Sequence, residues 1–178
     1  MPEATTHGLV IVYTGDGKGK TTAAFGQAMR AVGHGYKVAL IQFVKQLAVG
    51  EHAAARRLAP ELEVRTTGIG FVIPGKEPSL EKHRAAAEGG LALVREALTS
   101  GRYRMVVADE LLTAVGLNLL ARADVEALLD ARPAAMHLVI TGRGAWDELV
   151  RRADLVTEMR LVKHPYDAGV QSQAGIEF

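Results

Sequence analysis

Residues 14–22 read Thr14-Gly15-Asp16-Gly17-Lys18-Gly19-Lys20-Thr21-Thr22, between an apolar run at 9–13 and an alanine-rich stretch of helical spacing. Three glycines at every second position let the backbone turn its N–H groups around an anion, and a helix beginning near Lys20 points its positive end there. Lys20 adds a full charge, and Thr21 is placed to reach a magnesium ion. The stretch therefore predicts a phosphate-binding loop. It departs from the pattern Gly-x-x-x-x-Gly-Lys-[Ser/Thr] at the first position, where Thr14 stands, and a Gly-rich turn is the alternative interpretation.

Length and composition bound the class of protein. The chain has 178 residues, of which 48% are hydrophobic, and this favours one domain over residues 1–178 with a single core. A net charge of +1 argues against nucleic acid or a membrane surface as the main partner. The absence of cysteine excludes disulfides and thiolate chemistry. With neither a leader-like start nor a long apolar run, a cytoplasmic protein is expected.

Apolar runs of strand length alternate with stretches of helical period. The expected strands are 9–13, 37–43, 63–66, 104–108, 136–141 and 155–160, and the expected helices are 21–32, 51–58, 80–98, 110–120, 124–130 and 145–153. Several strands are almost continuously apolar, which is typical of strands buried on both faces of a parallel sheet. The pattern predicts a three-layer α/β domain with a mostly parallel sheet.

Carboxylates follow one of these strands directly. Asp109 and Glu110 stand where phosphate-loop proteins place an acid beside magnesium, at the carboxyl end of a sheet. We expect one of them to contact the ion directly or through water, although the pair could also mark a helix start.

Basic side chains stand near other strand ends. Arg143 could make a forked contact with a phosphate, with a surface arginine in a turn as the alternative. Lys45 is a weaker candidate of the same kind, and Lys18 inside the loop is a stronger one. The six histidines show no paired ligand spacing, so no histidine metal site is expected.

Two segments do not fit the alternation. Residues 67–78 combine three glycines and two prolines with bulky apolar side chains, which is typical of a segment that lines a site or packs on a core or second subunit. Residues 161–178 show no clear period but carry a polar set that includes His164, Asp167 and Gln173. Disorder is the alternative interpretation of this tail.

Taken together, the motifs strongly resemble one family, the phosphate-loop type of ATP:corrinoid adenosyltransferases, which act on cob(I)yrinic acid a,c-diamide or cob(I)alamin. The resemblance runs from about residue 10 to residue 178. The motifs that carry it are TGDGKGKTT (14–22), AAFG (23–26), AVGHG (31–35), QFVK (42–45), DEL (109–111), ARP (131–133), ITGRG (140–144), VKHPYDAGV (162–170) and QAGIE (173–177).

The resemblance implies a P-loop NTPase-like (RecA-like) fold and an enzyme that transfers the 5′-deoxyadenosyl group of ATP to the cobalt of a reduced corrinoid, releasing triphosphate with Mg²⁺ required. Cob(I) is itself a strong nucleophile, so the protein's task is positioning and charge neutralisation, by Lys20, Glu110 and Arg143. The resemblance also implies a homodimer and a reduced flavoprotein or flavin as electron donor. The expected ATP-binding residues are Thr14, Gly15, Asp16, Gly17, Lys18, Gly19, Lys20, Thr21, Thr22 and Arg143, and the expected metal-binding residues are Thr21, Glu110 and Asp109.

Two departures from the family accompany the resemblance. Family members commonly have Gly-Phe-Thr-Trp in the apolar loop over the corrinoid, where this chain has Gly70-Phe71-Val72-Ile73. Phe71 and Ile73 are therefore the expected corrinoid-binding residues, with less apolar area than the family pattern offers. Many members also carry an extra N-terminal helix. Two other functions remain open at this point: an ATP hydrolase or small-molecule kinase, and a non-catalytic corrinoid carrier or sensor.

Overall fold

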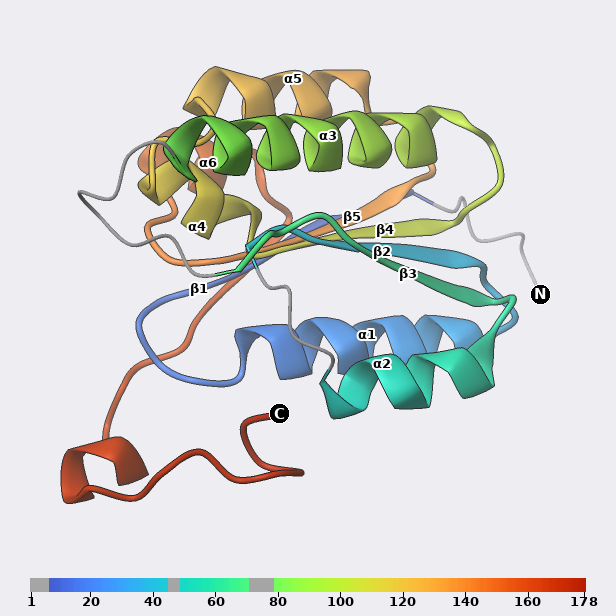
Figure 1. The fold of residues 1–178 in the computed structure, drawn as a ribbon. Helices are drawn as coiled ribbons and strands as arrows, with labels where there is room; N and C mark the ends of the chain where they lie inside the picture. The colour runs from blue at the N-terminus through green and yellow to red at the C-terminus, as the bar shows by residue number, and fades with distance from the viewer. Residues whose placement is uncertain (1–6, 45–48, 71–78) are drawn as a thin grey trace.

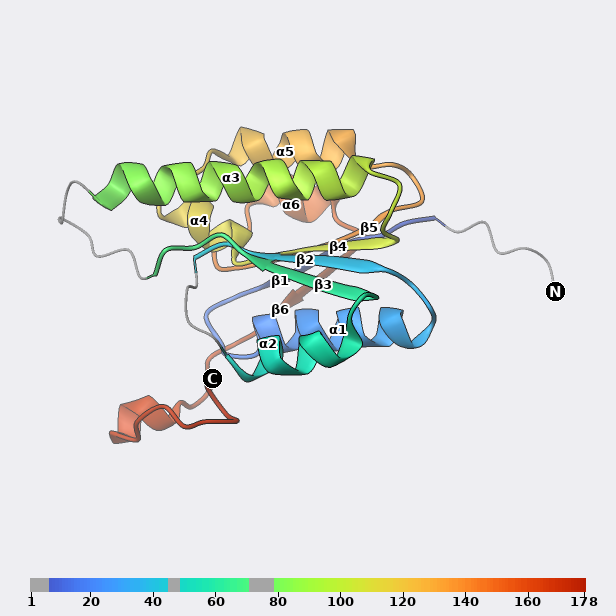
Figure 2. The same cartoon turned by 45° about the vertical axis from the view of Figure 1, so that its right-hand side comes forward.

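Six parallel strands form one sheet in the part of the chain that the structure, a computed structural model, describes: residues 7–44, 49–70 and 79–178. The strands are β1 (Val10–Thr14), β2 (Val38–Gln42), β3 (Leu62–Thr66), β4 (Met105–Asp109), β5 (His137–Thr141) and β6 (Leu155–Glu158). Their order across the sheet is β3-β2-β4-β5-β1-β6 (Figure 1, with β6 labelled in Figure 2). Every neighbouring pair is parallel, as the apolar runs predict.

Helices cover both faces of the sheet. The helices α1 (Lys20–Gly33) and α2 (Gly50–Ala55) lie on one face, and the second ends in the 3-10 turn η1 (Arg56–Leu58). The other face carries α3 (Ser79–Thr99), α4 (Leu111–Gly116), α5 (Arg122–Ala131) and α6 (Asp147–Arg152). Figure 2 shows the three layers edge-on, and this arrangement confirms the predicted α/β class. None of the helices in the described ranges is long and apolar enough to cross a membrane.

Each central strand contributes to two cores, because successive side chains point to opposite faces. In β4, Val106 and Ala108 pack with the α3–α6 layer, whereas Met105 and Val107 pack with the α1 layer. All four are at most 3% exposed, which explains why the strand is apolar at every position. The sheet is thus a rigid support for whatever its strand ends carry.

Small side chains bring α1 close to the sheet. Ala24, Ala28 and Ala31 recur at helical spacing and are buried against the strands. Because this helix continues directly from the glycine-rich loop, its packing fixes the position of that loop.

The helix expected at 110–120 is shorter than its apolar pattern suggests. It ends at Gly116, and Asn118 adopts a left-handed conformation with φ of 56°. The N–H groups of Asn118 and Leu119 donate to the carbonyl oxygens of Val115 and Ala114. This is the hydrogen-bond pattern of a Schellman C-cap, for which asparagine can replace glycine.

The strand β6 differs from the expected buried strand. Its four residues are all exposed, with Leu155 at 42% and Val156 at 37%. It lies at the edge of the sheet and pairs only with β1 among the described strands. An apolar run therefore predicted the strand correctly but not its burial.

Polar residues end four neighbouring strands at the same edge of the sheet. They are Thr14 of β1, Gln42 of β2, Asp109 of β4 and Thr141 of β5, each following an apolar run and each at most 9% exposed. Buried polar side chains are costly unless they are hydrogen-bonded. Ligands of open α/β sheets gather beyond this edge, so these residues mark the place to examine.

Candidate active site

The loop between β1 and α1 has the backbone of an anion-binding loop. Gly15 and Gly19 adopt φ values of 93° and 115°, in the left-handed region that glycine enters without steric cost. The first helical residue after them is Lys20. The helix N-terminus therefore opens toward the loop, where its free N–H groups favour an anion.

Gly17 is required for a different reason. Its N–H donates to the carbonyl oxygen of Met159 at 2.7 Å, so the loop is tied to the segment that follows β6. A Cβ atom at this position would lie 2.7 Å from the carbonyl oxygens of both Met159 and Arg160. Gly15 and Gly19 are thus needed for the turn of the loop, and Gly17 is needed because the backbone of residues 159–160 lies close to it.

Lys20 spans the loop from the helix side. Its ammonium donates to the carbonyl oxygens of Gly15 at 2.6 Å and Gly17 at 2.7 Å. Burial lowers the pKa of Lys20 from its usual value of 10.5, and Arg143 lowers it further, while the carboxylates of Glu110, Asp16 and Asp109 act in the opposite sense. A phosphate would stabilise the charged form that the site now disfavours.

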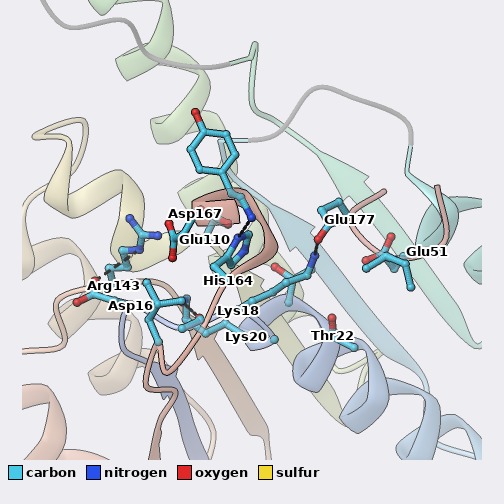
Figure 3. A pocket seen from close by; sticks show the side chains of 16 residues that line it. Asp16, Lys18, Lys20, Thr22, Glu51, Glu110, Arg143, His164, Asp167 and Glu177 are labelled. Carbon is cyan, nitrogen blue, oxygen red and sulfur yellow. Dashed lines mark hydrogen bonds and ion pairs between the residues drawn. The ribbon is translucent and has the colours of Figure 1, made fainter. Parts of the chain in front are cut away.

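A cavity of 450 Å³ lies against this loop (Figure 3). Its lining confirms that the loop, the end of β4 and the end of β5 meet, since it includes residues 16–22 together with Glu110 and Arg143. Thr14 and Gly15, which were also expected to bind ATP, are not among the residues that line the cavity. The Thr14 hydroxyl accepts a hydrogen bond from the N–H of Ala145 at 3.3 Å, and so fixes the loop that carries Arg143.

Asp109 lies beneath the cavity and is completely buried. Its Oδ2 accepts from the Thr21 hydroxyl at 3.2 Å and from Nε2 of Gln42 at 2.9 Å, and its Oδ1 accepts from the Thr141 hydroxyl at 2.7 Å. Three donors satisfy the buried carboxylate. Because the Thr21 hydroxyl donates its hydrogen bond to Asp109, the lone pairs of the Thr21 oxygen are available to a cation.

Glu110 both precedes a helix and faces the cavity. It is the N-cap residue of α4, yet its side chain makes no capping hydrogen bond and instead lines the cavity. Its φ of 63° is unusual for a residue with a side chain. The Thr141 hydroxyl accepts the Glu110 N–H at 2.8 Å and so holds this backbone conformation. The helix-start interpretation accounts for its position but not for the direction of its carboxylate.

Arg143 enters the cavity from the loop after β5. Its side chain is 68% exposed, and its Nε lies 3.7 Å from Oδ1 of Asp16. An ion pair this exposed contributes about 0–1 kcal/mol, so the guanidinium can exchange Asp16 for an anionic ligand.

The tail 161–178 forms another wall, in which Leu161, His164, Tyr166, Asp167, Ile176 and Glu177 line the cavity. It contains the 3-10 turn η2 (Pro165–Ala168). Lys18 donates to Oε1 of Glu177 at 2.5 Å, and this hydrogen bond, together with the N–H of Gln173 on Oε2, lowers the pKa of Glu177. The loop and the tail are joined by this ion pair. The tail is thus part of the site and not simply a terminus.

Several lining or supporting residues were not predicted. Glu51 of α2 lines the cavity. Gln42 and Thr141 donate hydrogen bonds to Asp109, and His52 contacts Gln42. The signal for Gln42 and Thr141 was a polar residue at the end of an apolar strand. The predicted candidates Phe71, Ile73 and Lys45 lie outside the described residues.

Comparison with solved structures supports the fold. The crystal structure of the RadB recombinase aligns with a TM-score of 0.50 at 13% sequence identity, covering 87% of this chain and 76% of that one. At this identity the likeness concerns the fold alone, and it is consistent with the RecA-like expectation.

Comparison of sequences goes further. A corrinoid adenosyltransferase of Pseudomonas aeruginosa is 41% identical over 172 residues, which is 96% of this chain and 84% of the relative. The corrinoid adenosyltransferase CobA of Salmonella typhimurium is 40% identical over 172 residues, which is 96% of this chain and 86% of that relative. The family model of the ATP:corrinoid adenosyltransferases BtuR/CobO/CobP matches residues 6–178. This chain therefore belongs to the ATP:corrinoid adenosyltransferase family.

Proposed function

We propose that this protein transfers the 5′-deoxyadenosyl group of ATP to the cobalt of a reduced corrinoid and releases triphosphate, as a step in the synthesis or salvage of adenosylcobalamin. The observation that carries the proposal is the 450 Å³ cavity in which a phosphate-binding loop, Glu110 and Arg143 converge, in a chain of this family. The cavity offers positions for a polyphosphate on one side and is bounded by the tail on the other.

The cations of the cavity act on the departing triphosphate. Lys20 would exchange the two loop carbonyl oxygens that it now contacts for phosphate oxygens, and Arg143 would leave Asp16 for the same ligand. Both charges are held by the protein before the reaction, so little reorganisation is needed as charge develops on the leaving group. The reduced cobalt supplies the nucleophile, and the protein supplies orientation of C5′.

The lining residues fit a magnesium ion. Five carboxylates (Asp16, Glu51, Glu110, Asp167 and Glu177) and three cations (Lys18, Lys20 and Arg143) line the cavity, so a polyphosphate would bring more negative charge to an already acidic wall. Magnesium in nucleotide sites takes one or two carboxylates and completes its shell with phosphate and water oxygens. Such a site needs no cluster of three or more His, Cys, Asp or Glu side chains placed to hold a metal ion, and the described residues contain no such cluster.

Thr21 and Glu110 would hold the ion, and Asp109 would act behind Thr21. The Thr21 hydroxyl donates a hydrogen bond to Asp109, which leaves the lone pairs of its oxygen free for the ion, and the Glu110 carboxylate lines the same cavity. A bound Mg²⁺ would screen the charge of the triphosphate.

Corrinoid binding is assigned to the apolar segment that contains Phe71 and Ile73, on the family resemblance. We expect Phe71→Ala to reduce adenosyl transfer while ATP binding stays unchanged, because the residues expected to bind ATP are those of the loop and Arg143. Loss of ATP binding in calorimetry, or unchanged transfer, would contradict this assignment.

The proposal includes partners that rest on the same resemblance. They are a reduced flavoprotein or flavin as electron donor and a second copy of this chain in a homodimer. The cytoplasm as the place of reaction, with neither nucleic acid nor a membrane as partner, is proposed on the charge and apolar pattern of the sequence. Light scattering coupled to gel filtration would give the oligomeric state directly.

The function is tested by anaerobic incubation with Mg²⁺, ATP and chemically reduced cob(I)alamin, following the absorbance of the adenosylated corrinoid and its loss on illumination. We expect product with the wild-type protein and none with Lys20→Ala. Corrinoid binding without product would favour a carrier, and product formation by Lys20→Ala at the wild-type rate would contradict the role of the loop.

A further inference from the structure

A chain of side-chain hydrogen bonds leads from the loop to a helix on the surface. Thr21 donates to Asp109 at 3.2 Å, Gln42 donates to the same Oδ2 at 2.9 Å, and Nε2 of His52 contacts Oε1 of Gln42. Gln42 ends β2 and is fully buried, whereas His52 lies on α2 and is partly buried. These hydrogen bonds link α2 to Asp109, which lies behind the proposed magnesium ligand Thr21.

The direction of each hydrogen bond follows from chemistry. An ionised carboxylate only accepts, so Gln42 must present its NH₂ group to Asp109 and its oxygen to His52. That oxygen also only accepts, so His52 must carry its proton on Nε2. Reversing the amide would set its oxygen against the carboxylate of Asp109. The charge on Asp109 therefore selects one orientation of Gln42 and one tautomer of His52.

Burying the polar side chain of Gln42 in an apolar strand costs free energy unless its amide is hydrogen-bonded. The rest of β2 is Val38, Ala39, Leu40 and Ile41, all buried and apolar, and an apolar residue would complete the strand at position 42. Burying an amide is unfavourable unless both of its ends are hydrogen-bonded. Gln42 satisfies this condition only because Asp109 and His52 stand on either side of it.

We propose that Gln42 and His52 are positioning residues for the magnesium-nucleotide site. They hold the carboxylate of Asp109 so that Oδ2 accepts the hydrogen bond of the Thr21 hydroxyl, which leaves the lone pairs of the Thr21 oxygen open to the ion. Without Gln42, Thr21 and Thr141 are the remaining donors to the carboxylate, which is then held less firmly against Thr21. This inference rests on the proposed function, because it concerns how the site binds ATP with Mg²⁺. Residues behind a metal ligand typically change metal affinity about 10- to 100-fold when they are replaced.

The test is calorimetric titration of ATP with Mg²⁺ and, separately, with EDTA, so that no turnover is needed. We expect His52→Leu and Gln42→Met to weaken ATP binding about 10-fold with Mg²⁺ and to leave binding in EDTA unchanged. His52→Gln, whose amide nitrogen can donate to the Gln42 oxygen, should restore most of the affinity. His34→Leu, at the exposed far end of α1, is the matched control and should bind as wild type does.

Two results would overturn the inference. One is wild-type affinity for ATP and Mg²⁺ in His52→Leu. The other is an equal loss with and without Mg²⁺ together with a lowered melting temperature, which would make the pair merely structural. If Gln42→Met does not fold, the two His52 variants still decide the matter. The transfer assay separates this inference from the proposed function. No adenosylated product from the wild-type protein would contradict the function, whereas the Mg²⁺-dependent ATP affinity of the His52 variants is measured without any transfer.

Discussion

Thr141 joins the two carboxylates of the site, and its hydroxyl can be removed with little change of shape. The hydroxyl donates to Oδ1 of Asp109 at 2.7 Å and accepts the N–H of Glu110 at 2.8 Å, and the residue is 1% exposed. In Thr141→Val a methyl group replaces that hydroxyl. The variant therefore leaves a buried carboxylate oxygen and a backbone N–H without their partner.

The expected loss can be worked out from these two contacts. A buried hydrogen bond to a charged group contributes about 2 kcal/mol, and an unsatisfied N–H costs about 1 kcal/mol more. The sum of about 3 kcal/mol corresponds to about a hundredfold change in the folding equilibrium. For a chain of this length it should lower the melting temperature by about 6–12 °C.

Urea unfolding followed by the fluorescence of Trp146, the single tryptophan, measures the change. Thr141→Ser is the matched control, because it keeps the hydroxyl and removes a methyl group, at a cost of about 1 kcal/mol. A loss of less than about 1 kcal/mol in Thr141→Val, or equal losses in the two variants, would refute the reasoning.

Three further predictions concern the loop, the start of β5 and the tail. Gly17→Ala should destabilise the protein by about 2 kcal/mol, because its Cβ meets backbone carbonyl oxygens at 2.7 Å, and an unchanged thermal midpoint would contradict that contact. Burial lowers the pKa of His137 below its usual value of 6.5, and the charges of Arg104, Arg132 and His7 lower it further. The neutral form of His137 therefore stabilises the protein above pH 6.5, and this stability is lost as the pH falls below that value. His137→Asn, whose amide oxygen can still accept the Leu9 N–H, should lose less stability over that acid range in pH-dependent denaturation, and parallel curves would argue against it. Glu177→Gln should tighten ATP binding severalfold by releasing Lys18, an effect that should vanish in a Lys18→Ala background, and weaker binding in calorimetry would mean that the tail assists the nucleotide.

Local sequence was sufficient to predict the loop and the sheet. Alternate glycines, the basic residue at the helix start and apolar strands are short-range features, so they can be recognised from neighbouring residues alone. The position of Asp109 and Glu110 followed equally from the end of a strand. The resulting β1–α1 loop and parallel sheet agree with those expectations.

The supporting contacts depend on residues that are distant in sequence. Gln42 and Asp109 are 67 positions apart, and only the pairing of β2 with β4 brings them together. Periodicity gives the type of an element but not its neighbours, so neither this contact nor the exposure of β6 could be predicted. The tail has no period at all, and its place is set by contacts such as Lys18 with Glu177, 159 positions away.

The identity of the phosphate product tests the central claim most directly. In a single turnover with limiting cob(I)alamin, ATP and Mg²⁺, phosphorus NMR would identify what leaves the nucleotide while absorbance counts the adenosylated corrinoid. The account predicts triphosphate in one-to-one ratio with that product, because the bond broken is at C5′ and the loop, Lys20 and Arg143 hold the three phosphates as one leaving group. Release of ADP with no adenosylated corrinoid would contradict it and identify the cavity as the site of a phosphoryl-transfer enzyme.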